Sequence, residues 1–177
     1  MVSAPGSVEG ATQYLSFRLD EEAYAIAILR VKEILRYAPV TRVPSTPAFI
    51  HGVINLRGQV VPIIDLAVKF GLPPWVESKW TCVVVVEIEL DGEDTVMGLL
   101  VDSVHQVLEL APGDIEEPPA FGPRIHVDYL LGMGKLDHKK FVMLLDIDRV
   151  LTEGEMLSAT SLQEVHVEDP PAPGGSR

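Results

Sequence analysis

The chain has 177 residues, of which 26 are acidic and 14 basic, so its formal net charge at pH 7 is −12. This length allows one domain, or two small ones, with a real hydrophobic core. The acidic balance and the lack of a basic stripe disfavour binding to nucleic acid or to a membrane surface. No apolar run is long enough to span a membrane, the N-terminus lacks signal-peptide features, and the single cysteine cannot form an internal disulfide. We therefore expect a cytoplasmic protein without direct membrane insertion.

The N-terminal third of the chain predicts strands and one tight hairpin. Residues 1–11 are small and polar, and we expect them to be disordered. Gln13–Leu19 alternates with a period of two, which is typical of a strand. Within residues 47–66, PAFIHGVINLRGQVVPIIDL, apolar patches flank Asn55–Gly58, whose glycine is free to adopt a positive φ; this pattern predicts strand, turn and strand. Arg57 lies at the tip among apolar neighbours, without a nucleophile or paired carboxylate, which favours binding a partner over catalysis.

A second hairpin and two short helices are expected further along the chain. Thr81–Leu90 begins almost wholly apolar and ends alternating, and an acidic turn connects it to a return strand, Thr95–Val101. Helical patterns are few and cover only Leu66–Phe70 and Asp146–Leu157. Residues 158–177 are acidic and then rich in proline and glycine, so we expect a disordered tail.

The sequence also repeats itself. Ala25–Ile34 aligns without a gap with Gly98–Val107, 73 residues later. Gly52–Leu66 resembles Gly132–Ile147, where the offset has grown to 80 or 81 residues. The growth places about seven extra residues in the second half, in the Pro-rich connector 111–123. Two copies of several short strands in the same order predict two small β-barrels.

No catalytic, cofactor-binding or metal-ligating constellation accompanies these elements. Cys82 opens an apolar strand without a basic neighbour, so we expect a buried structural thiol. The five histidines are scattered without metal-type spacing, and Gly132–Lys135 lacks the full pattern of a phosphate loop. Asp65 and Asp146 hold equivalent repeat positions before the two helical segments, and we interpret them as helix N-caps.

The hairpin block, together with Val40–Pro44 before it, closely resembles the CheW family of bacterial chemotaxis coupling proteins, over roughly Gln13–Met156. The resemblance implies an all-β fold of two intertwined, five-stranded SH3-like barrels with short helices, formed by residues 12–157. It also implies a non-catalytic adaptor or scaffold in a two-component system. The expected partners are the cytoplasmic tip of methyl-accepting chemoreceptors and the regulatory domain of the histidine kinase CheA, which is itself CheW-like. Other CheW-like domains are further candidate partners.

The contact residues follow partly from pattern and partly from the resemblance. By pattern, alternate residues of the strand after residue 30 and their repeat equivalents are expected to line a groove between the barrels; the alternative is that the valines belong to the core. In CheW proteins, the positions that match these residues meet the receptor tip or the neighbouring kinase domain. The resemblance also implies that an aromatic residue in the stiff loop 117–123 lies near a neighbouring CheW-like domain. The alternative is that this aromatic residue packs on its own barrel. Glu33 is expected to pair with Arg57. The full set of candidate binding residues is Val31, Glu33, Ile34, Gly52, Arg57, Val104, Val107 and Phe121.

Two other functions remain open at this point. One is the same module in a chemosensory-type pathway that does not control flagella. The other is a small hydrolase or ligand-binding barrel, which would need a concave site with convergent polar groups. The sequence contains no pattern for such a site.

Overall fold

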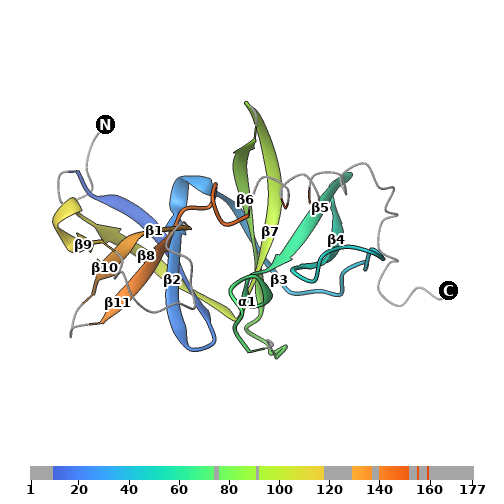
Figure 1. Ribbon diagram of the computed structural model, residues 1–177, viewed down its shortest axis with the longest axis horizontal. Coiled ribbons are helices and arrows are strands. Elements are labelled where there is room, and N and C mark those ends of the chain that lie inside the picture. Colours follow the sequence, from blue (N-terminus) through green and yellow to red (C-terminus); the bar gives the residue numbers. More distant parts are fainter. Residues whose placement is uncertain are drawn as a thin grey trace.

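The computed structural model describes residues 10–73, 76–90, 92–117, 129–136, 140–151, 155 and 159. Strands dominate it, and the only α-helix among its labelled elements has four residues (Figure 1). In chain order the elements are β1 (Thr12–Leu19), β2 (Glu22–Ala27), the 3₁₀ turn η1 (Ile28–Arg30), β3 (Val31–Arg36), β4 (Ile50–Leu56), β5 (Gln59–Asp65), α1 (Leu66–Lys69), β6 (Cys82–Leu90), β7 (Glu93–Val101), β8 (Ser103–Leu110), η2 (Pro112–Asp114), β9 (Ile115–Glu116), β10 (Leu130–Lys135) and β11 (Phe141–Leu145).

The strands form two sheets, and the chain passes from the first sheet to the second and back again. The first sheet, called here the first barrel, has the order β8-β1-β2-β11-β10-β9; the second barrel has the order β3-β6-β7-β5-β4. The chain leaves the first barrel after β2, builds the whole of the second, and returns after β7 (Figure 1). The expected all-β class with two intertwined barrels is therefore confirmed. The first barrel has six strands rather than five, because the two-residue β9 adds to β10.

The internal repeat is confirmed strand by strand. Reading β8-β1-β2-β11-β10 against β3-β6-β7-β5-β4 matches every neighbour, including the parallel pairs of β11 with β2 and of β5 with β7. The aligned segments Ala25–Ile34 and Gly98–Val107 are the two places where the chain crosses from one barrel to the other. The other repeated pair contains the β4–β5 and β10–β11 hairpins.

Two glycines at equivalent positions allow close approach of the backbone. A Cβ atom on Gly52 would lie 2.6 Å from the carbonyl oxygen of Thr41, and one on Gly132 would lie 2.8 Å from that of Glu116. Both glycines follow a register shift in their hairpin. Gly52 is buried, so its role is to let a neighbouring segment pack against β4.

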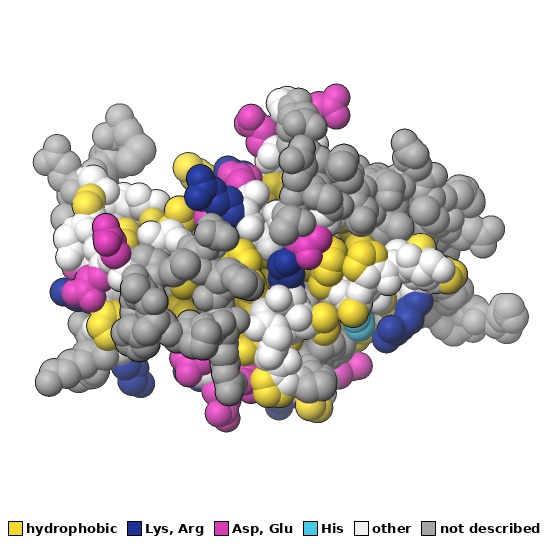
Figure 2. Space-filling model, viewed as in Figure 1, with side chains coloured by type: hydrophobic (Ala, Val, Ile, Leu, Met, Phe, Trp, Pro, Cys, Tyr) yellow, Lys and Arg dark blue, Asp and Glu magenta, His cyan; other side chains and the backbone are white. Residues whose placement is uncertain are grey.

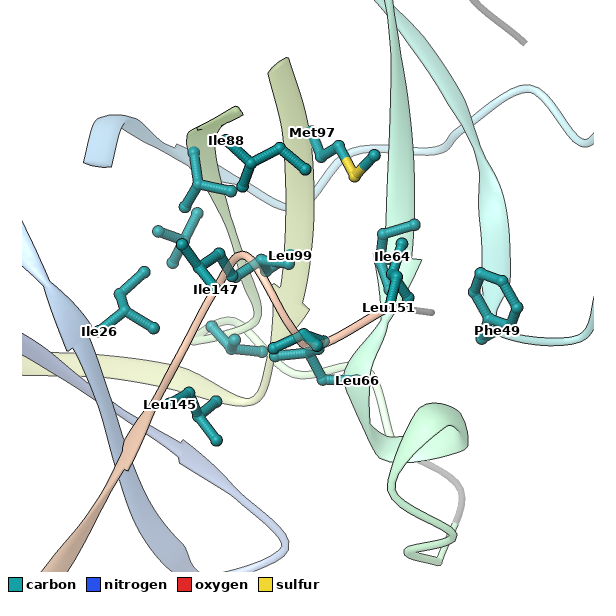
Figure 3. Packing of buried hydrophobic residues seen from close by; sticks show 14 of the residues in the cluster. Ile26, Phe49, Ile64, Leu66, Ile88, Met97, Leu99, Leu145, Ile147 and Leu151 are labelled. Atoms are coloured by element: carbon teal, nitrogen blue, oxygen red, sulfur yellow. The ribbon is translucent and has the colours of Figure 1, made fainter. Parts of the chain in front are cut away.

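Three hydrophobic cores hold the molecule together. A small core fills each barrel: Val61, Ile63, Val83, Val85, Val96 and Leu100 in the second, and Tyr14, Ala25, Leu110, Val142 and Leu144 in the first. A larger cluster, the inter-barrel core, lies between them (Figure 3). It combines Ile26 and Leu145 of the first barrel with Ile64, Leu66 and Leu99 of the second barrel and its helix. Burial of this shared cluster joins the two barrels into one unit.

The two expected helices have different outcomes. α1 forms as predicted, and the carboxylate of Asp65 caps it by accepting a hydrogen bond from the backbone N–H of Val68 at 3.2 Å. The helix expected from Asp146 is wrong at its start, because residues 147–151 form turns and bends. Asp146 instead accepts from the backbone N–H of Asp148, 3.1 Å away, as in an Asx turn. The rest of that prediction lies outside the described residues, except for Glu155, which is helical.

One residue of the expected tail belongs to the core. Ala159 is helical and fully buried in the inter-barrel core, although we expected a disordered tail from residue 158. Residues 160–177, like residues 1–9 at the other end, lie outside the described residues. At least one position beyond residue 157 is therefore part of the core.

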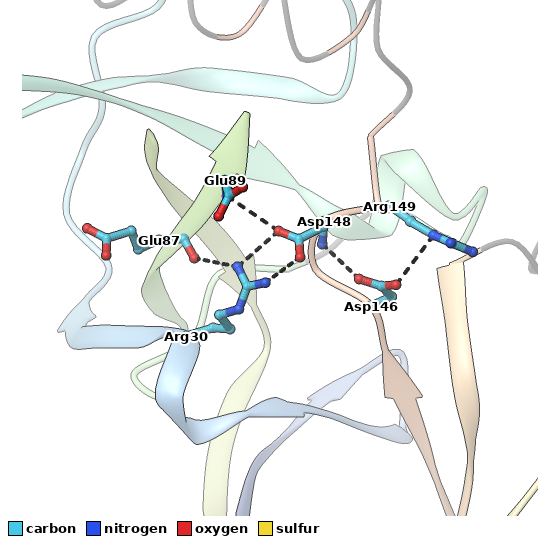
Figure 4. A network of polar contacts seen from close by, with 6 residues as sticks. All are labelled: Arg30, Glu87, Glu89, Asp146, Asp148 and Arg149. Atoms are coloured by element: carbon cyan, nitrogen blue, oxygen red, sulfur yellow. Dashed lines mark hydrogen bonds and ion pairs between the residues drawn. The ribbon is translucent and has the colours of Figure 1, made fainter. Parts of the chain in front are cut away.

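A polar network braces the first crossover between the barrels (Figure 4). The guanidinium of Arg30, in η1, forms two hydrogen bonds with the carboxylate of Asp148 and donates to the backbone carbonyl of Glu87 at 3.1 Å. The hydrogen bond to Asp148 raises the pKa of Arg30 above its ordinary value. The turn after β11 is thus tied both to η1 and to β6.

The inter-barrel core makes a prediction for α1. Changing the fully buried Leu66 to Ala should lower the free energy of unfolding by about 2–5 kcal/mol, because it leaves a cavity between the barrels. Val68, two residues on in the same helix, is 40% exposed, and Val68→Ala should change it by only about 0.5 kcal/mol. Urea denaturation of both variants measures the difference. Equal losses would contradict the placement of α1 against the core.

Candidate interaction surface

β3 is an edge strand whose side chains alternate between the protein interior and solvent. Val31, Glu33 and Leu35 are half-buried, whereas Lys32, Ile34 and Arg36 are exposed. Val31 packs against the inter-barrel core. β3 pairs with β6 on one side only, and it lies at the end of its sheet. A row of exposed side chains therefore stands on a strand whose outer edge pairs with no other strand among the residues that the structure describes.

The β4–β5 hairpin presents Arg57 at its tip, as the sequence predicted. The connection has two residues, Arg57 and Gly58, with φ angles of 53° and 86°, as expected for a type I′ turn. Asn55 supports the turn by accepting a hydrogen bond from the backbone N–H of Gly58 at 2.8 Å. The sequence predicted positive φ for the glycine alone, so the conformation of Arg57 was missed.

The expected pair between Arg57 and Glu33 is present. Nη2 of Arg57 donates to Oε2 of Glu33, which joins the hairpin tip to β3. The side chain of Arg57 is 71% exposed and that of Glu33 is 28% exposed. Exposure of this kind limits the stabilisation to about 0–1 kcal/mol. The bond therefore orients the guanidinium more than it stabilises the fold, and it leaves most of the guanidinium facing solvent.

An apolar groove on the second barrel is lined by residues of β3, of β4 and of the segment between these strands. Its volume is about 230 Å³, and it runs between the end of β3 and the edge of β4. Its floor and walls are formed chiefly by Leu35, Val40, Val53, Ile54, Leu56 and Val83, with Arg36 also lining it. We expected a groove between the barrels; this one belongs to the second barrel alone.

A hydrogen bond ties the residue that follows β3 to β4. Tyr37 Oη and His51 Nε2 lie 2.9 Å apart, and the two rings are in contact. Burial, with a smaller effect from the nearby Arg42, lowers the pKa of His51, while burial raises the pKa of Tyr37. Both side chains are therefore neutral at pH 7. Figure 2 shows one histidine with a basic and several apolar side chains near it on the face that is drawn.

The candidate residues on β8 mirror those on β3. Val104 packs against the inter-barrel core, as its repeat equivalent Val31 does. Val107 is 48% exposed and its equivalent Ile34 is 44% exposed. Val31 and Val104 therefore support the core, whereas Ile34 and Val107 face solvent, and a groove between the barrels lined by these residues stays a prediction. Because β3 and β8 are edge strands of different sheets, the exposed positions lie on different barrels.

The structure gives no contact surface for Phe121, for Cys82 or for a metal ion in the part of the chain that it describes. Phe121 and the loop around it, from residue 118 to 128, lie outside the described residues. Cys82 is only half-buried; burial raises the pKa of its thiol, which donates to the carbonyl oxygen of Trp80 at 3.1 Å. In the part of the chain that the structure describes, no group of three His, Cys, Asp or Glu side chains is placed to hold a metal ion. No described helix is long and apolar enough to cross a membrane.

Sequence reasoning missed the groove, the Tyr37–His51 contact and the Arg30–Asp148 pair. Each joins residues that are distant in the chain and carry no shared motif. One weak signal was available for the first two: the alternation of β3 continues to Tyr37, which predicts an inward aromatic residue at the strand end.

Known proteins resemble this chain over most of its length. The family model described as the CheW-like domain matches residues 13–155. The chain is 40% identical to chemotaxis protein CheW of Klebsiella aerogenes over 154 residues, covering 87% of this chain and 90% of the relative. It is 33% identical to chemotaxis protein CheW of Helicobacter pylori over 144 residues, covering 81% and 83%.

A solved structure agrees with the sequence relatives. The scaffolding protein TtCheW from Thermoanaerobacter tengcongensis matches with a TM-score of 0.72 and 33% identity, over 82% of this chain and 95% of that one. The two barrels described above are the SH3-like β-barrels of this structure. By family model, sequence identity and fold together, the chain belongs to the CheW-like family.

Proposed function

We propose that this protein is a non-catalytic cytoplasmic adaptor that couples methyl-accepting chemoreceptors to a CheA-type histidine kinase. The observation that carries the proposal is the Arg57–Glu33 pair, which holds an exposed guanidinium at the tip of the β4–β5 hairpin beside β3, in a chain of the CheW-like family. The relatives are named as chemotaxis proteins and one as a scaffolding protein, which supports the same role.

We propose two binding surfaces. We assign the first surface to the helical receptor tip, because an apolar helix face can pack on its exposed aliphatic side chains. This surface consists of Val31, Glu33, Ile34, Arg57, Val104 and Val107. The second is the end of the barrels, including the region of Gly52 and the apolar groove, which we assign to the kinase regulatory domain. Phe121 remains a proposed contact to a further CheW-like domain. Control would pass between these sites as a coupling free energy, without chemistry.

The adaptor could act in flagellar chemotaxis or in a non-flagellar chemosensory pathway. The same module in a non-flagellar chemosensory pathway would use the same surfaces, so the structure favours neither pathway. A ligand-binding or hydrolytic barrel is less well supported, because the groove is lined mainly by aliphatic side chains and not by convergent polar groups.

Retention of partners tests the proposal directly. Immobilised full-length chain should hold back a purified CheA-type kinase and, when the kinase is present, a soluble receptor fragment. A surface-matched acidic protein serves as the control for non-specific retention. Failure to retain both partners would refute the adaptor role.

Arg57 gives the sharpest prediction. Arg57→Ala should change the free energy of unfolding by about 1 kcal/mol or less, because its pair with Glu33 is exposed. Receptor control of the kinase should nonetheless be lost, since a guanidinium's forked donors orient a partner in a way that alanine cannot. Arg57→Lys should rescue control only in part, and Glu33→Ala should show a similar defect that does not add to the first.

The chain offers a matched control for this series. Lys135, in β10 of the first barrel, forms another exposed ion pair, with Glu116, and Lys135→Ala should leave receptor control intact. A reconstituted kinase assay beside thermal melts measures both effects. Normal control by a folded Arg57→Ala protein would remove Arg57 from the binding surface.

The exposed aliphatic pair makes a second prediction. Ile34→Asp and Val107→Asp should each weaken binding of a partner by about tenfold or more, the loss expected for a buried contact at an interface. Their melting temperatures should change little, because both side chains are nearly half exposed. Val76→Asp, at an 82% exposed site after α1, is the control. Isothermal titration calorimetry with receptor and kinase fragments measures the affinities; unchanged values for both variants would exclude this surface.

A further inference from the structure

The C-terminal segment returns to the boundary between the barrels and is fastened there. After β11, Val150 and Leu151 enter the inter-barrel core, and Ala159 does so again. Between them, both carboxylate oxygens of Glu155 lie close to Nζ of Lys69, at 2.6 and 2.8 Å. The side chains of Lys69 and Glu155 are 13% and 26% exposed, so this ion pair is the least exposed of those found among the described residues.

Lys69 also stands where the two repeats meet. Its Nζ lies 5.8 Å from the ring centroid of Phe49 and 6.0 Å from that of Tyr129. These aromatic residues are equivalent in the repeat: the carbonyl of Phe49 accepts from the N–H of Asp65 at 2.7 Å, and that of Tyr129 accepts from the N–H of Asp146 at 2.9 Å. One ammonium group therefore contacts matching aromatic rings that precede β4 of the second barrel and β10 of the first.

We propose that the Lys69–Glu155 pair is a latch that fixes the orientation of the two barrels relative to each other. Apolar packing in the inter-barrel core is not directional, so it permits small sliding movements. The short charge-assisted contacts from Lys69 Nζ to both carboxylate oxygens hold the two side chains at one separation, and partial burial makes loss of one partner costly. The pair joins α1 of the second barrel to the C-terminal segment that follows the first. When it opens, the barrels change their relative orientation by a small amount while the inter-barrel core stays buried.

The latch bears on signalling through the position of the two exposed aliphatic sites. Ile34 lies on the second barrel and Val107 on the first, so the orientation of the barrels sets the distance between these sites. This consequence rests on the proposed function, whereas the latch itself does not. The tests below use neither receptor nor kinase, so the two proposals can fail separately.

Distance measurement between spin labels tests the latch. Labels on cysteines introduced at Glu22, in β2, and Gln59, in β5, report the separation of the barrels, with Cys82→Ser to remove the native thiol. Lys69→Met should broaden or shift the distance distribution, and Lys69→Arg should restore it. Lys135→Met removes an exposed pair with Glu116 inside the first barrel and should leave the distribution unchanged. An unchanged distribution in folded Lys69→Met protein would overturn the proposal.

Hydrogen exchange separates a latch from a contribution to overall stability. In Lys69→Met protein, the amides of Val150, Leu151, Glu155 and Ala159 should exchange at least about tenfold faster, while β6 and β7 keep their rates. Equal acceleration everywhere would show that the pair only stabilises the whole fold, and the proposal would be wrong. Should Lys69→Met fail to fold, Glu155→Gln provides the same comparison, because it keeps the acceptor's shape and removes its charge.

Discussion

Burial of aliphatic and aromatic side chains between the barrels is the interaction on which the rest of the structure depends. Each barrel has only a handful of residues in its own core, too few to hold a sheet of five or six short strands by themselves. The inter-barrel core supplies the missing burial, and both crossovers, α1 and the turn after β11 contribute to it or border it. The position of Val31 and Val104 against this core fixes the strands that carry the exposed sites beside them.

Polar contacts orient particular side chains and segments around this apolar core. Arg30 and Asp148 brace one crossover, Tyr37 and His51 tie β3 to β4, and Arg57 and Glu33 fix the hairpin tip. None of these is buried deeply enough to dominate the free energy of folding. Their value lies in orienting side chains on a surface whose exposed guanidinium and aliphatic groups are suited to partners. A binding protein of this kind needs a rigid surface and has no need of perturbed catalytic groups.

Much of this architecture follows from local pattern. The alternation in Gln13–Leu19, the turn chemistry of Asn55–Gly58 and the cap at Asp65 each predicted the element that forms, because the physical cause lies within a few residues. The helix expected at Asp146 failed for the opposite reason. Ile147, Val150 and Leu151 have helical spacing, but the inter-barrel core draws them in from a turn. Ala159 gave no signal at all, since a single alanine in a polar stretch does not reveal its burial.

The alternating path of the chain has a consequence for how the protein is made. All five strands of the second barrel, β3 to β7, are complete once residue 101 has been synthesised. The first barrel cannot form until β8 and β11 have been synthesised, because Thr12 pairs with Leu110 and Tyr24 with Met143. During that interval β1 and β2 form a lone hairpin that is marginal in water, with apolar faces exposed. On a ribosome, the earliest-made strands of this protein are therefore among the last to find their partners, and chaperone contact is expected at residues 12–27 rather than at the C-terminus.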